Sequence, residues 1–463
     1  MISVNTGITP EILKSDLDRL IDLAGQKIFK LKEKWMPEKG TPVFTVKGRY
    51  TLRGWTEWTQ GFMYGMPLLH FDATGNTASL EYGRKSTMEL MAPHLTHIGV
   101  HDHGFNNIST YGNLYRLMKE GKIDKDKWEM NFYELALKVS GAVQAARWTE
   151  LPDNLGYICS FNGPHSLFID TMRSLRILAV SHQLGHFLMG EQDQRISLIE
   201  RLLKHAETTN QYCIYHGNNR DSFDINGRVV HESIFNLNSG AYRCPSTQQG
   251  YSPFSTWTRG LAWAICGYAE QLEFLDYLDE KEFMEIDIDG MSRKEEFIKH
   301  FLNTAQQIAD FYIANTPTDG IPYWDTGAPN LTSIENYLDK PADPYNDYEP
   351  VDSSAASITA QGLIRLGKFL SKNGDAERGN HYISAGLTVA KSLFREPYIS
   401  TDSEHEGLIL HSVYHRPNGW DYIPPDQKIP CGESSMWGDY HALELAVLIK
   451  RMAENNYMNF FIK

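Results

Sequence analysis

Apolar side chains recur every three or four residues along most of the chain, which is the period of a helix with one buried face. In the segment 9–35 most of them fall on one stripe. Comparable stretches occur at 57–72, 77–92, 107–120, 127–148, 165–180, 183–206, 255–276, 293–315, 353–371, 374–394 and 434–454. Alternating strand patterns are scarce, so the sequence predicts an all-α protein of about twelve helices.

The spacing of these helices indicates their arrangement. Pairs recur at intervals typical of helical hairpins, which pack around a ring or along a solenoid. Aromatic and polar clusters fall where helices begin, and in a ring these junctions would meet around a central cavity. Two longer irregular regions, 207–254 and 316–352, are candidates for functional loops. No linker divides the sequence, so we expect residues 1–463 to form a single domain.

The charge of the chain narrows the classes of partner. Its 463 residues include 58 acidic and 44 basic side chains, for a net charge of −14 with histidine neutral. A nucleic-acid-binding protein needs a basic face for the phosphates, so we expect no nucleic acid partner. A small anionic substrate stays open if an arginine or a histidine lies in the site.

Cysteine usage and hydropathy bear on the compartment. The five cysteines are odd in number and never CxxC-spaced, so neither a disulfide framework nor structural zinc is expected. No apolar run is long enough to span a membrane, and the first residues lack the pattern of a signal peptide. We expect a cytoplasmic protein without a membrane partner, with the periplasm as the alternative if a signal peptide has been removed.

One short stretch is unusually rich in metal-ligand side chains: His94, His97, His101, Asp102 and His103. His97 and His101 have the i, i+4 spacing of a zinc-binding helix, but the glutamate of the H-E-x-x-H motif is missing. We interpret the stretch as a polar loop that lines a pocket, with a metal site and plain surface histidines as the alternatives.

The segment SFNGPHSLFIDTMRSLRIL, residues 160–178, predicts a helix with Pro164 in its first turn. Asp170 then lies in the second turn among apolar neighbours. On an inward face such a carboxyl has a raised pKa, which suits a proton donor near neutral pH. The alternative is a surface aspartate or one paired with Arg173 at i+3.

Aromatic residues frame two further helix starts. Arg259 lies between Trp257 and Trp263, where an arginine can bind a carboxylate while an indole stacks on a sugar face. Of Trp55 and Trp58, one is expected to stack on a ligand. Core packing is the alternative for both groups. The segments DSSAAS (352–357) and ESSMWGDY (433–440) read as helix starts capped by Asp or Ser.

Six of these motifs, in this order, resemble glycoside hydrolase family 88, the unsaturated glucuronyl hydrolases. They are WTQGF at 58–62, HDHGF at 101–105, FIDTM at 168–172, WTRGLAW at 257–263, DSSA at 352–355 and WGDY at 437–440. The resemblance runs from about residue 55 to 445. It implies an (α/α)6 barrel, which agrees with the count of helices.

The resemblance also implies roles for individual residues. Asp170 would be the general acid/base and Asp102 the second essential carboxylate. The implied substrate-binding residues are His231, Gln249, Arg259, Trp263 and Trp58. Phe161 stands where the family typically has a tryptophan, so stacking area and saccharide preference are expected to differ. The region 316–352 has no counterpart that we can align.

The implied substrate is an oligosaccharide left by a polysaccharide lyase, of the glycosaminoglycan type, with a C4=C5 double bond in its non-reducing uronate. Hydration of that enol ether would need no metal or organic cofactor. We expect a monomer or a weak homo-oligomer. The alternatives are a family 105 unsaturated rhamnogalacturonyl hydrolase acting on pectin fragments, an (α/α)6 sugar epimerase, and a non-catalytic saccharide-binding barrel.

Overall fold

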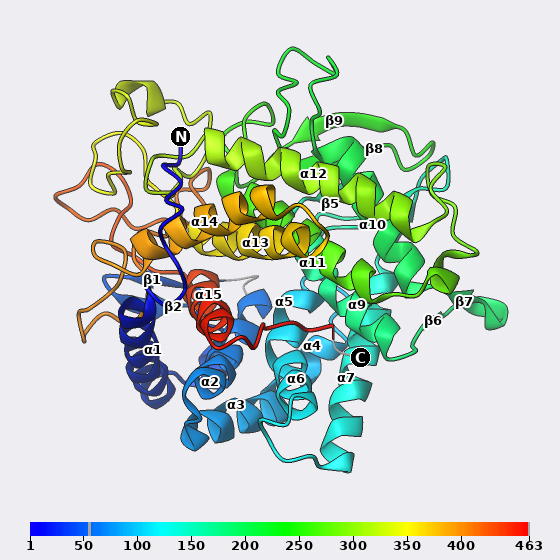
Figure 1. The fold of residues 1–463 in the computed structure, drawn as a ribbon, viewed down its shortest axis with the longest axis horizontal. Helices are drawn as coiled ribbons and strands as arrows, with labels where there is room; N and C mark the ends of the chain where they lie inside the picture. The colour runs from blue at the N-terminus through cyan, green and yellow to red at the C-terminus, as the bar shows by residue number, and fades with distance from the viewer. Residues whose placement is uncertain (54–56, 462–463) are drawn as a thin grey trace.

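The computed structural model describes residues 1–53 and 57–461, and helices dominate these residues (Figure 1). Six helical columns are buried on nearly all sides and form an inner ring. They are α2 (Gln60–Thr74), α5 (His103–Asn107) with a π-helical turn (Ile108–Gly112) and α6 (Asn113–Lys119), α8 (Thr171–Ser174) with α9 (Arg176–Gln183), α11 (Thr258–Tyr277), α13 (Ser353–Lys372) and α15 (Met436–Ala453). Successive columns pack against each other and α15 packs against α2, so the ring is closed.

A second layer of helices surrounds the ring and exposes one face to solvent. Its members are α1 (Lys14–Lys34), α3 (Thr77–Leu90), α7 (Lys127–Ala146), α10 (Leu198–Cys213), α12 (Lys294–Ala314) and α14 (Ala376–Leu393). In Figure 1, α14 lies along α13 and α3 lies along α2, as expected for helical hairpins. A short helix, α4 (Ala92–Leu95), precedes α5. The architecture is the (α/α)6 barrel that the sequence predicts.

Short antiparallel sheets decorate the helix junctions. The two-stranded ones are β1 (Phe44–Val46) with β2 (Arg49–Thr51), β3 (Trp148–Glu150) with β4 (Gly156–Ile158), and β6 (Leu188–Met189) with β7 (Arg195–Ile196). The three-stranded one has the order β5 (Ser166–Phe168), β8 (Glu232–Phe235), β9 (Tyr242–Ser246).

Two helix predictions are wrong at their starts. The helix expected over 165–180 begins only at Thr171, because residues 166–168 form β5 and pair with β8. The helix expected over 183–206 begins at Leu198, because residues 188–196 form the hairpin β6–β7. Gly185 has a φ of +74° just before that hairpin, a conformation that ends a helix.

The inner helices all begin at one end of the ring, and local signals fix the starts of α13 and α15. The carboxylate of Asp352 accepts a hydrogen bond from the Ser354 amide at 3.0 Å, and the Ser435 hydroxyl accepts one from Gly438 at 3.1 Å, so both are the N-caps predicted. Gly104 lets α5 approach α8, because a β-carbon there would lie 2.0 Å from the Ser174 carbonyl oxygen. This contact brings the HDHGF segment beside Asp170.

An aromatic layer crosses the barrel below these helix starts. The rings of Phe105 and Trp263 lie 4.8 Å apart, those of Trp263 and His441 5.0 Å apart, and those of Phe62 and Tyr440 4.9 Å apart. We call this layer the aromatic floor. It is contributed by α2, α5, α11 and α15, so it spans the ring from side to side.

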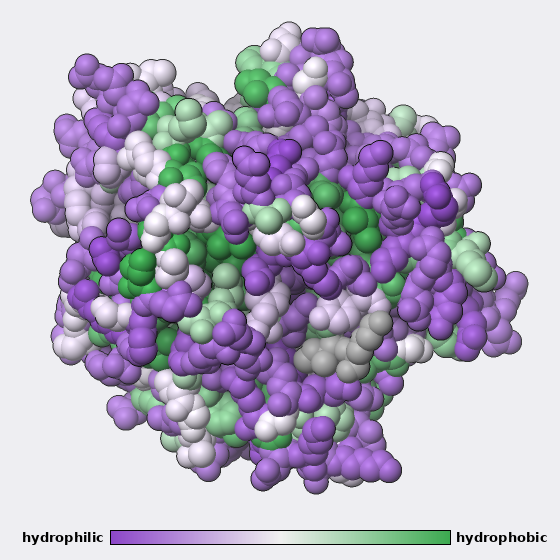
Figure 2. Space-filling view, in the orientation of Figure 1, coloured by the Kyte–Doolittle hydropathy of each residue, from purple (hydrophilic) through white to green (hydrophobic). Residues whose placement is uncertain are grey.

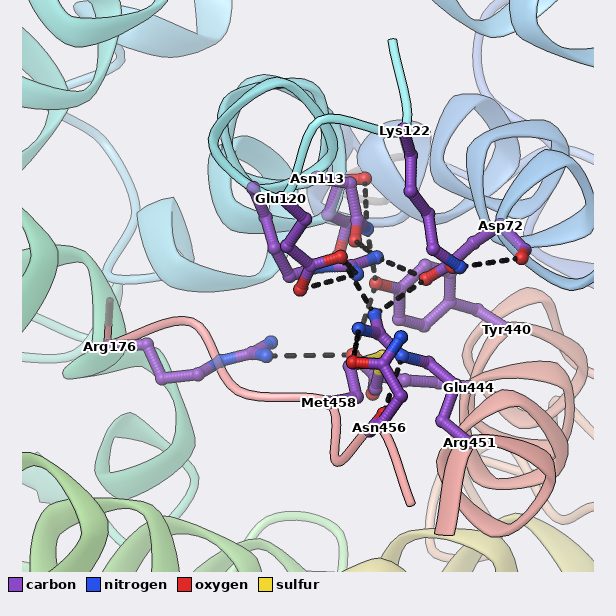
Figure 3. A network of polar contacts seen from close by, with 12 residues as sticks. Asp72, Asn113, Glu120, Lys122, Arg176, Tyr440, Glu444, Arg451, Asn456 and Met458 are labelled. Atoms are coloured by element: carbon purple, nitrogen blue, oxygen red, sulfur yellow. Dashed lines mark hydrogen bonds and ion pairs between the residues drawn. The ribbon is translucent and has the colours of Figure 1, made fainter. Parts of the chain in front are cut away.

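Beyond the aromatic floor, charged side chains fill the axis of the barrel. We call them the basal network: Asp72, Arg116, Glu120, Lys122, Arg173, Arg176, Glu270, Glu273, Arg365, Glu444 and Arg451. Figure 3 shows part of it, with Asp72 from α2 meeting Arg451 from α15. Arg173 joins Glu270 at 2.6 Å and Glu444 at 3.0 Å, and all three side chains are almost completely buried.

The chain after α15 crosses this end of the barrel. The Phe460 ring lies under Arg116 and Arg176, at 5.6 and 5.1 Å from their guanidinium carbons. The Met458 carbonyl accepts a hydrogen bond from Arg365. This end of the ring is therefore closed by protein.

The face turned to the viewer in Figure 2 is the one on which the C-terminal tail lies, and it is largely hydrophilic with scattered apolar patches. Within residues 1–53 and 57–461, none of the helices combines the length and apolarity that a bilayer crossing requires.

Candidate active site

A cavity of about 410 Å³ opens at the end of the ring where the inner helices begin. Most of the residues singled out in the sequence line it, and they are Trp58, Asp102, Phe161, Asp170, Gln249, Arg259 and Trp263. Its other lining residues are His97, Gly99, Val100, His101, Phe105, Gln248, Trp257, Tyr414, His415, Asn418 and Trp420. Segments far apart in the sequence thus meet in one aromatic-rich hollow, which is the usual form of a ligand site.

Asp170 lies at the N-cap of α8, directly after β5, and not in the second turn of a helix as expected. Its Oδ1 lies 3.0 Å from Nε2 of His101. Both side chains are almost completely buried although they line the cavity. Because β5 pairs with β8, the turn that carries Asp170 is held by two independent segments.

The charge state of this pair differs from the expectation. Burial is the largest influence on the Asp170 pKa and raises it, but the charge and hydrogen bond of His101, with smaller contributions from His231 and Arg259, outweigh burial and hold the pKa below the ordinary 3.8. The prediction of a raised pKa is therefore wrong for this structure. For His101, burial lowers the pKa, but the charges of Asp102 and Asp170 together raise it above 6.5. The proton of the pair accordingly resides on His101.

Asp102 is the second carboxylate of the cavity. It precedes α5 as the N-cap residue, and its Oδ1 lies 3.9 Å from Nε2 of His101. The same nitrogen lies 3.0 Å from Oδ1 of Asp170, so the two carboxylate oxygens are at most about 6.9 Å apart. His101 thus stands between two acids and reduces their mutual repulsion.

Arg259 is engaged by the protein itself. Its Nη1 donates to Asp352 at 2.9 Å and to the Val413 carbonyl at 2.5 Å. Its Nη2 donates to Gln249 Oε1 at 2.9 Å and to the Tyr414 carbonyl at 2.8 Å. The expectation that Arg259 offers a free planar fork to a substrate carboxylate is corrected on this point, because both terminal nitrogens already have protein acceptors. Arg259 instead joins α11, the start of α13 and the 413–414 backbone.

His231 and Gln249 present donors near Asp170. The backbone amide of Gln248 donates to Nδ1 of His231 at 3.0 Å, so the proton of the neutral ring is on Nε2. That Nε2 is buried and has no hydrogen-bond partner in the described part of the chain. Burial lowers the pKa of His231 to about 4, so the ring is neutral at pH 7. Because Gln249 accepts through Oε1 from Arg259, its amide nitrogen is the end left for a ligand.

Comparisons with known proteins bear on what this cavity does. No family model matches the chain. An unsaturated glucuronyl hydrolase of Bacillus sp. (strain GL1) is 27% identical over 413 residues, which cover 87% of this chain and 89% of the relative. An unsaturated chondroitin disaccharide hydrolase of Streptococcus agalactiae serotype III is 23% identical and covers 94% of this chain and 92% of its own length.

The chain is thus similar over most of its length to unsaturated glucuronyl hydrolases, which agrees with the resemblance to glycoside hydrolase family 88 that its motifs carry. The solved structure of the unsaturated glucuronyl hydrolase from Bacillus sp. GL1, described as responsible for the degradation of glycosaminoglycan, has a TM-score of 0.69 to this one. The likeness covers 96% of this chain and 99% of that one at 23% identity, and at that identity it shows the fold.

The aromatic residues to which the motifs assign stacking roles line the cavity. Trp58 stacks on Trp437 with ring centroids 5.1 Å apart, and one side of it faces the cavity. Phe161, in place of the family's tryptophan, is 46% exposed and lies parallel to the His101 ring at 6.2 Å. Trp263 belongs to the aromatic floor. Trp55 lies outside the described residues.

The histidines of the 94–103 stretch have different contacts and different roles. His94 contacts Gln60 at 2.5 Å and Asn106 at 3.2 Å, and His103 contacts Ser140 at 3.0 Å, so these rings fix the loop to α2, α5 and α7. His101 is the member of the stretch whose ring contacts Asp170. Throughout residues 1–53 and 57–461, three or more His, Cys, Asp or Glu side chains are nowhere grouped as metal ligands would be.

One wall of the cavity was missed by sequence reasoning. It comes from residues 414–420, inside a third irregular region between α14 and α15. Asp421 holds this loop by accepting hydrogen bonds from the Tyr414 and His415 amides, and the Trp420 ring lies 4.8 Å from the ring of His415. The sequence YHRPNGW has the Pro-Asn-Gly signature of a turn between aromatics, which was the available signal.

Proposed function

We propose that this protein removes the unsaturated uronate from the non-reducing end of lyase-derived, glycosaminoglycan-type oligosaccharides, with Asp170 as general acid/base. The observation that carries the residue assignment is the placement of Asp170. It is a carboxyl in an aromatic-lined cavity, joined at 3.0 Å to a histidine that can store its proton. The wider activity is the one for which the similar proteins are named.

The reaction begins at the double bond, which is an enol ether because the ring oxygen is attached to C5. The Asp170 carboxyl delivers a proton to C4, and the positive charge that develops is shared by C5 and the ring oxygen. Asp170, now a carboxylate, accepts a proton from a water that adds to C5. The resulting hemiketal opens, and the remaining saccharide leaves as an alcohol. One carboxyl therefore serves twice, unlike the paired carboxylates that flank the scissile bond in ordinary glycosidases.

His101 supplies the proton with which Asp170 starts. In the free site the proton lies on His101, since Asp102 and Asp170 raise its pKa and the pKa of Asp170 is low. A uronate carboxylate entering the cavity adds negative charge beside Asp170, which raises the pKa of that carboxyl. The proton then moves from Nε2 of His101 to Oδ1 of Asp170, a distance of 3.0 Å.

The uronate carboxylate needs donors that the protein does not already use. We assign the amide nitrogen of Gln249 and Nε2–H of His231, since both are left over after their other atoms are engaged. Arg259 contributes its positive charge at short range and orients Gln249 through the 2.9 Å bond to Oε1. Trp58, Phe161 and Trp263 supply apolar faces for the sugar rings.

We further propose that residues 1–463 act as one catalytic domain, as a monomer or weak homo-oligomer, because all the groups assigned here come from one chain. The five cysteines are free thiols, which supports a cytoplasmic, reducing location. The preference for sulfation and linkage is measured with a panel of disaccharides.

The test is a panel of unsaturated disaccharides from chondroitin, hyaluronan, heparin and pectin-derived rhamnogalacturonan, followed by the ultraviolet absorbance of the double bond. We expect absorbance to fall with the glycosaminoglycan disaccharides. Turnover of the rhamnogalacturonan disaccharide alone would assign the family 105 type of substrate. Unchanged absorbance with every substrate would contradict the proposal, since an epimerase or a binding protein leaves the double bond intact.

A further inference from the structure

A second hollow of about 220 Å³ adjoins the catalytic cavity. Arg416 and Pro417 line it, and they belong to the same 414–420 loop that gives His415 and Asn418 to the catalytic cavity. Tyr251 lines it as well, two residues after Gln249. Neighbouring Cα atoms are about 3.8 Å apart, so the two hollows share a rim only a residue or two wide.

The far wall of this hollow comes from the region 316–352, which aligned with nothing in the family. Trp324, Asn330 and Glu349 are its members there. The Trp324 indole donates to Glu349 Oε2 at 2.8 Å, and the backbone and side-chain amides of Asn330 donate to Glu349 Oε1 at 3.0 Å each. The wall is therefore cross-linked before any ligand arrives.

The opposite side is also fixed. The backbone amide of Tyr251 donates to Asp325 Oδ2 at 2.8 Å, next in sequence to Trp324. The Tyr251 side chain remains 50% exposed, so its ring can lie against a sugar. Asn330 uses its donors on Glu349, which leaves its exposed Oδ1 as an acceptor for a hydroxyl group.

The two charged side chains of the hollow, Glu349 and Arg416, differ in how far the protein compensates them. Glu349 is 2% exposed and accepts three hydrogen bonds, so its negative charge is compensated. Arg416 forms no ion pair with any described residue, and its Nε is buried without a hydrogen-bond partner among them. Burial raises the pKa of the nearby Asp421 and the charge of Arg416 acts against this rise, but that carboxylate accepts its hydrogen bonds from the Tyr414 and His415 amides. The partly buried guanidinium is therefore not in an ion pair and favours an anionic ligand.

We propose that this hollow is a second saccharide subsite, in which Arg416 binds the carboxylate of an internal hexuronate while the unsaturated residue occupies the catalytic cavity. The inference rests on the proposed function. It predicts that tetrasaccharides with an acidic repeat are better substrates than disaccharides. The shared chemistry is an anionic group on the leaving saccharide, so a sulfate ester is the competing source to be separated.

The test compares kcat/KM on the unsaturated disaccharide and tetrasaccharide of hyaluronan, which carry no sulfate. The Arg416→Ala protein should lose about tenfold more on the tetrasaccharide than on the disaccharide, the scale of one charge-assisted hydrogen bond. Arg416→Lys should recover part of the difference. Arg243→Ala is the matched control, because Arg243 is exposed on β9 and lines neither hollow.

A chemical arm removes the ligand group instead of the arginine. A tetrasaccharide whose internal uronate is reduced to the neutral sugar should behave with the wild type as the intact one does with Arg416→Ala, and the two changes should not add. Equal losses on disaccharide and tetrasaccharide in Arg416→Ala would overturn the subsite. So would a loss confined to a sulfated disaccharide, which would place Arg416 on a sulfate nearer the catalytic residue. If the wild type leaves the double bond of both substrates intact, it is the proposed function that fails.

Discussion

The two ends of the barrel handle buried charge in opposite ways. In the basal network every acid is surrounded by cations that belong to the protein, as Asp72 is by Arg116, Lys122 and Arg451. At the open end, Nε2 of His231 is buried without a hydrogen-bond partner among the described residues, Gln249 uses its Oε1 on Arg259, and Asp170 and His101 lie 3.0 Å apart with one proton between them. At the closed end the charges of the protein are paired with one another and hold the helices together, whereas at the open end polar groups without protein partners are available for chemistry.

This comparison predicts that substitutions at the open end cost activity and substitutions at the closed end cost stability. The largest effect is expected for Asp170→Asn. An amide can neither donate nor accept the catalytic proton, so kcat should fall by about 10²–10⁴-fold or more, the usual value of general acid/base catalysis. Binding and the melting temperature should change little. Steady-state kinetics, substrate titration and thermal unfolding measure these quantities, with the exposed Asp153→Asn as the control.

A kcat within about tenfold of the wild type in the Asp170→Asn protein would contradict the assignment, because the general acid/base would then be another group.

At the closed end, Asp72→Asn should lower the free energy of unfolding by about 3–5 kcal/mol, since it removes one partner of a buried ionic cluster. kcat/KM should be unchanged at temperatures where the variant stays folded. Urea unfolding followed by circular dichroism gives the first quantity and disaccharide kinetics the second. Asp276→Asn is the control, because it breaks a pair with the 66% exposed Lys372 and should cost less than about 1 kcal/mol.

The stability that Asp72 contributes should also depend on pH. Burial raises the Asp72 pKa, but Arg116, Arg451 and Lys122 lower it more, to about 2. The stabilisation is therefore complete above the ordinary value of 3.8 and is lost as pH falls toward about 2. Over that range the free energy of unfolding of the wild type should fall more steeply with pH than that of Asp72→Asn. Parallel curves would show that Asp72 is not a source of acid sensitivity.

A smaller and more specific effect is expected for His101→Gln, which keeps a hydrogen-bond donor but cannot store a proton. Asp170 must then hold the proton alone, so the alkaline limb of kcat/KM should move to lower pH by about one unit or more. The other titratable or charged neighbours stay in place, namely Asp102, Arg147, His205, His231 and Arg259. The pH profile of disaccharide turnover measures the shift.

His300→Gln is the control for this profile, because His300 also has a raised pKa, caused first by its hydrogen bond to Glu207, but lies on α12 away from the cavity. A uniform loss of rate with an unmoved profile in His101→Gln would show that His101 acts only by packing.

The smallest effect is expected from exhaustive chelation. The histidines of the 94–103 stretch make separate contacts with Gln60, Ser140 and Asp170, so activity should persist without added metal. Activity that disappears with chelator and returns with zinc would replace the acid/base mechanism by a metal-assisted one.

The sequence predicts the features that depend on local signals better than those that depend on distant contacts. Helix periodicity and capping are local, so most helix positions and the caps at Asp352 and Ser435 follow from the chain itself. The start of α8 does not, because β5 is created by pairing with residues 232–234, far along the sequence. A helix is predicted there because the residues themselves carry no signal for the strand.

The chemical state of the site was less predictable than its composition. The motifs name Asp170 and Arg259, but the Asp170 pKa depends on His101, 69 positions away. Three of the four acceptors that occupy Arg259 lie 93 to 155 positions away. Burial alone predicts a raised carboxyl pKa, and the position of Arg259 between two tryptophans predicts an arginine that binds a substrate carboxylate. The actual neighbours reverse both conclusions.

The aromatic floor determines how a polymer can be consumed. A hollow that is closed beneath Asp170 admits a chain terminus, whereas an internal residue would have to continue through Phe105 and Trp263. Product and substrate pass through the same opening of the cavity, so the product must leave before the next substrate binds. The shortened saccharide has no double bond and is therefore not a substrate for a second round. Each cut made by a lyase therefore creates one end that this cavity can accept, and the number of such ends limits the number of turnovers.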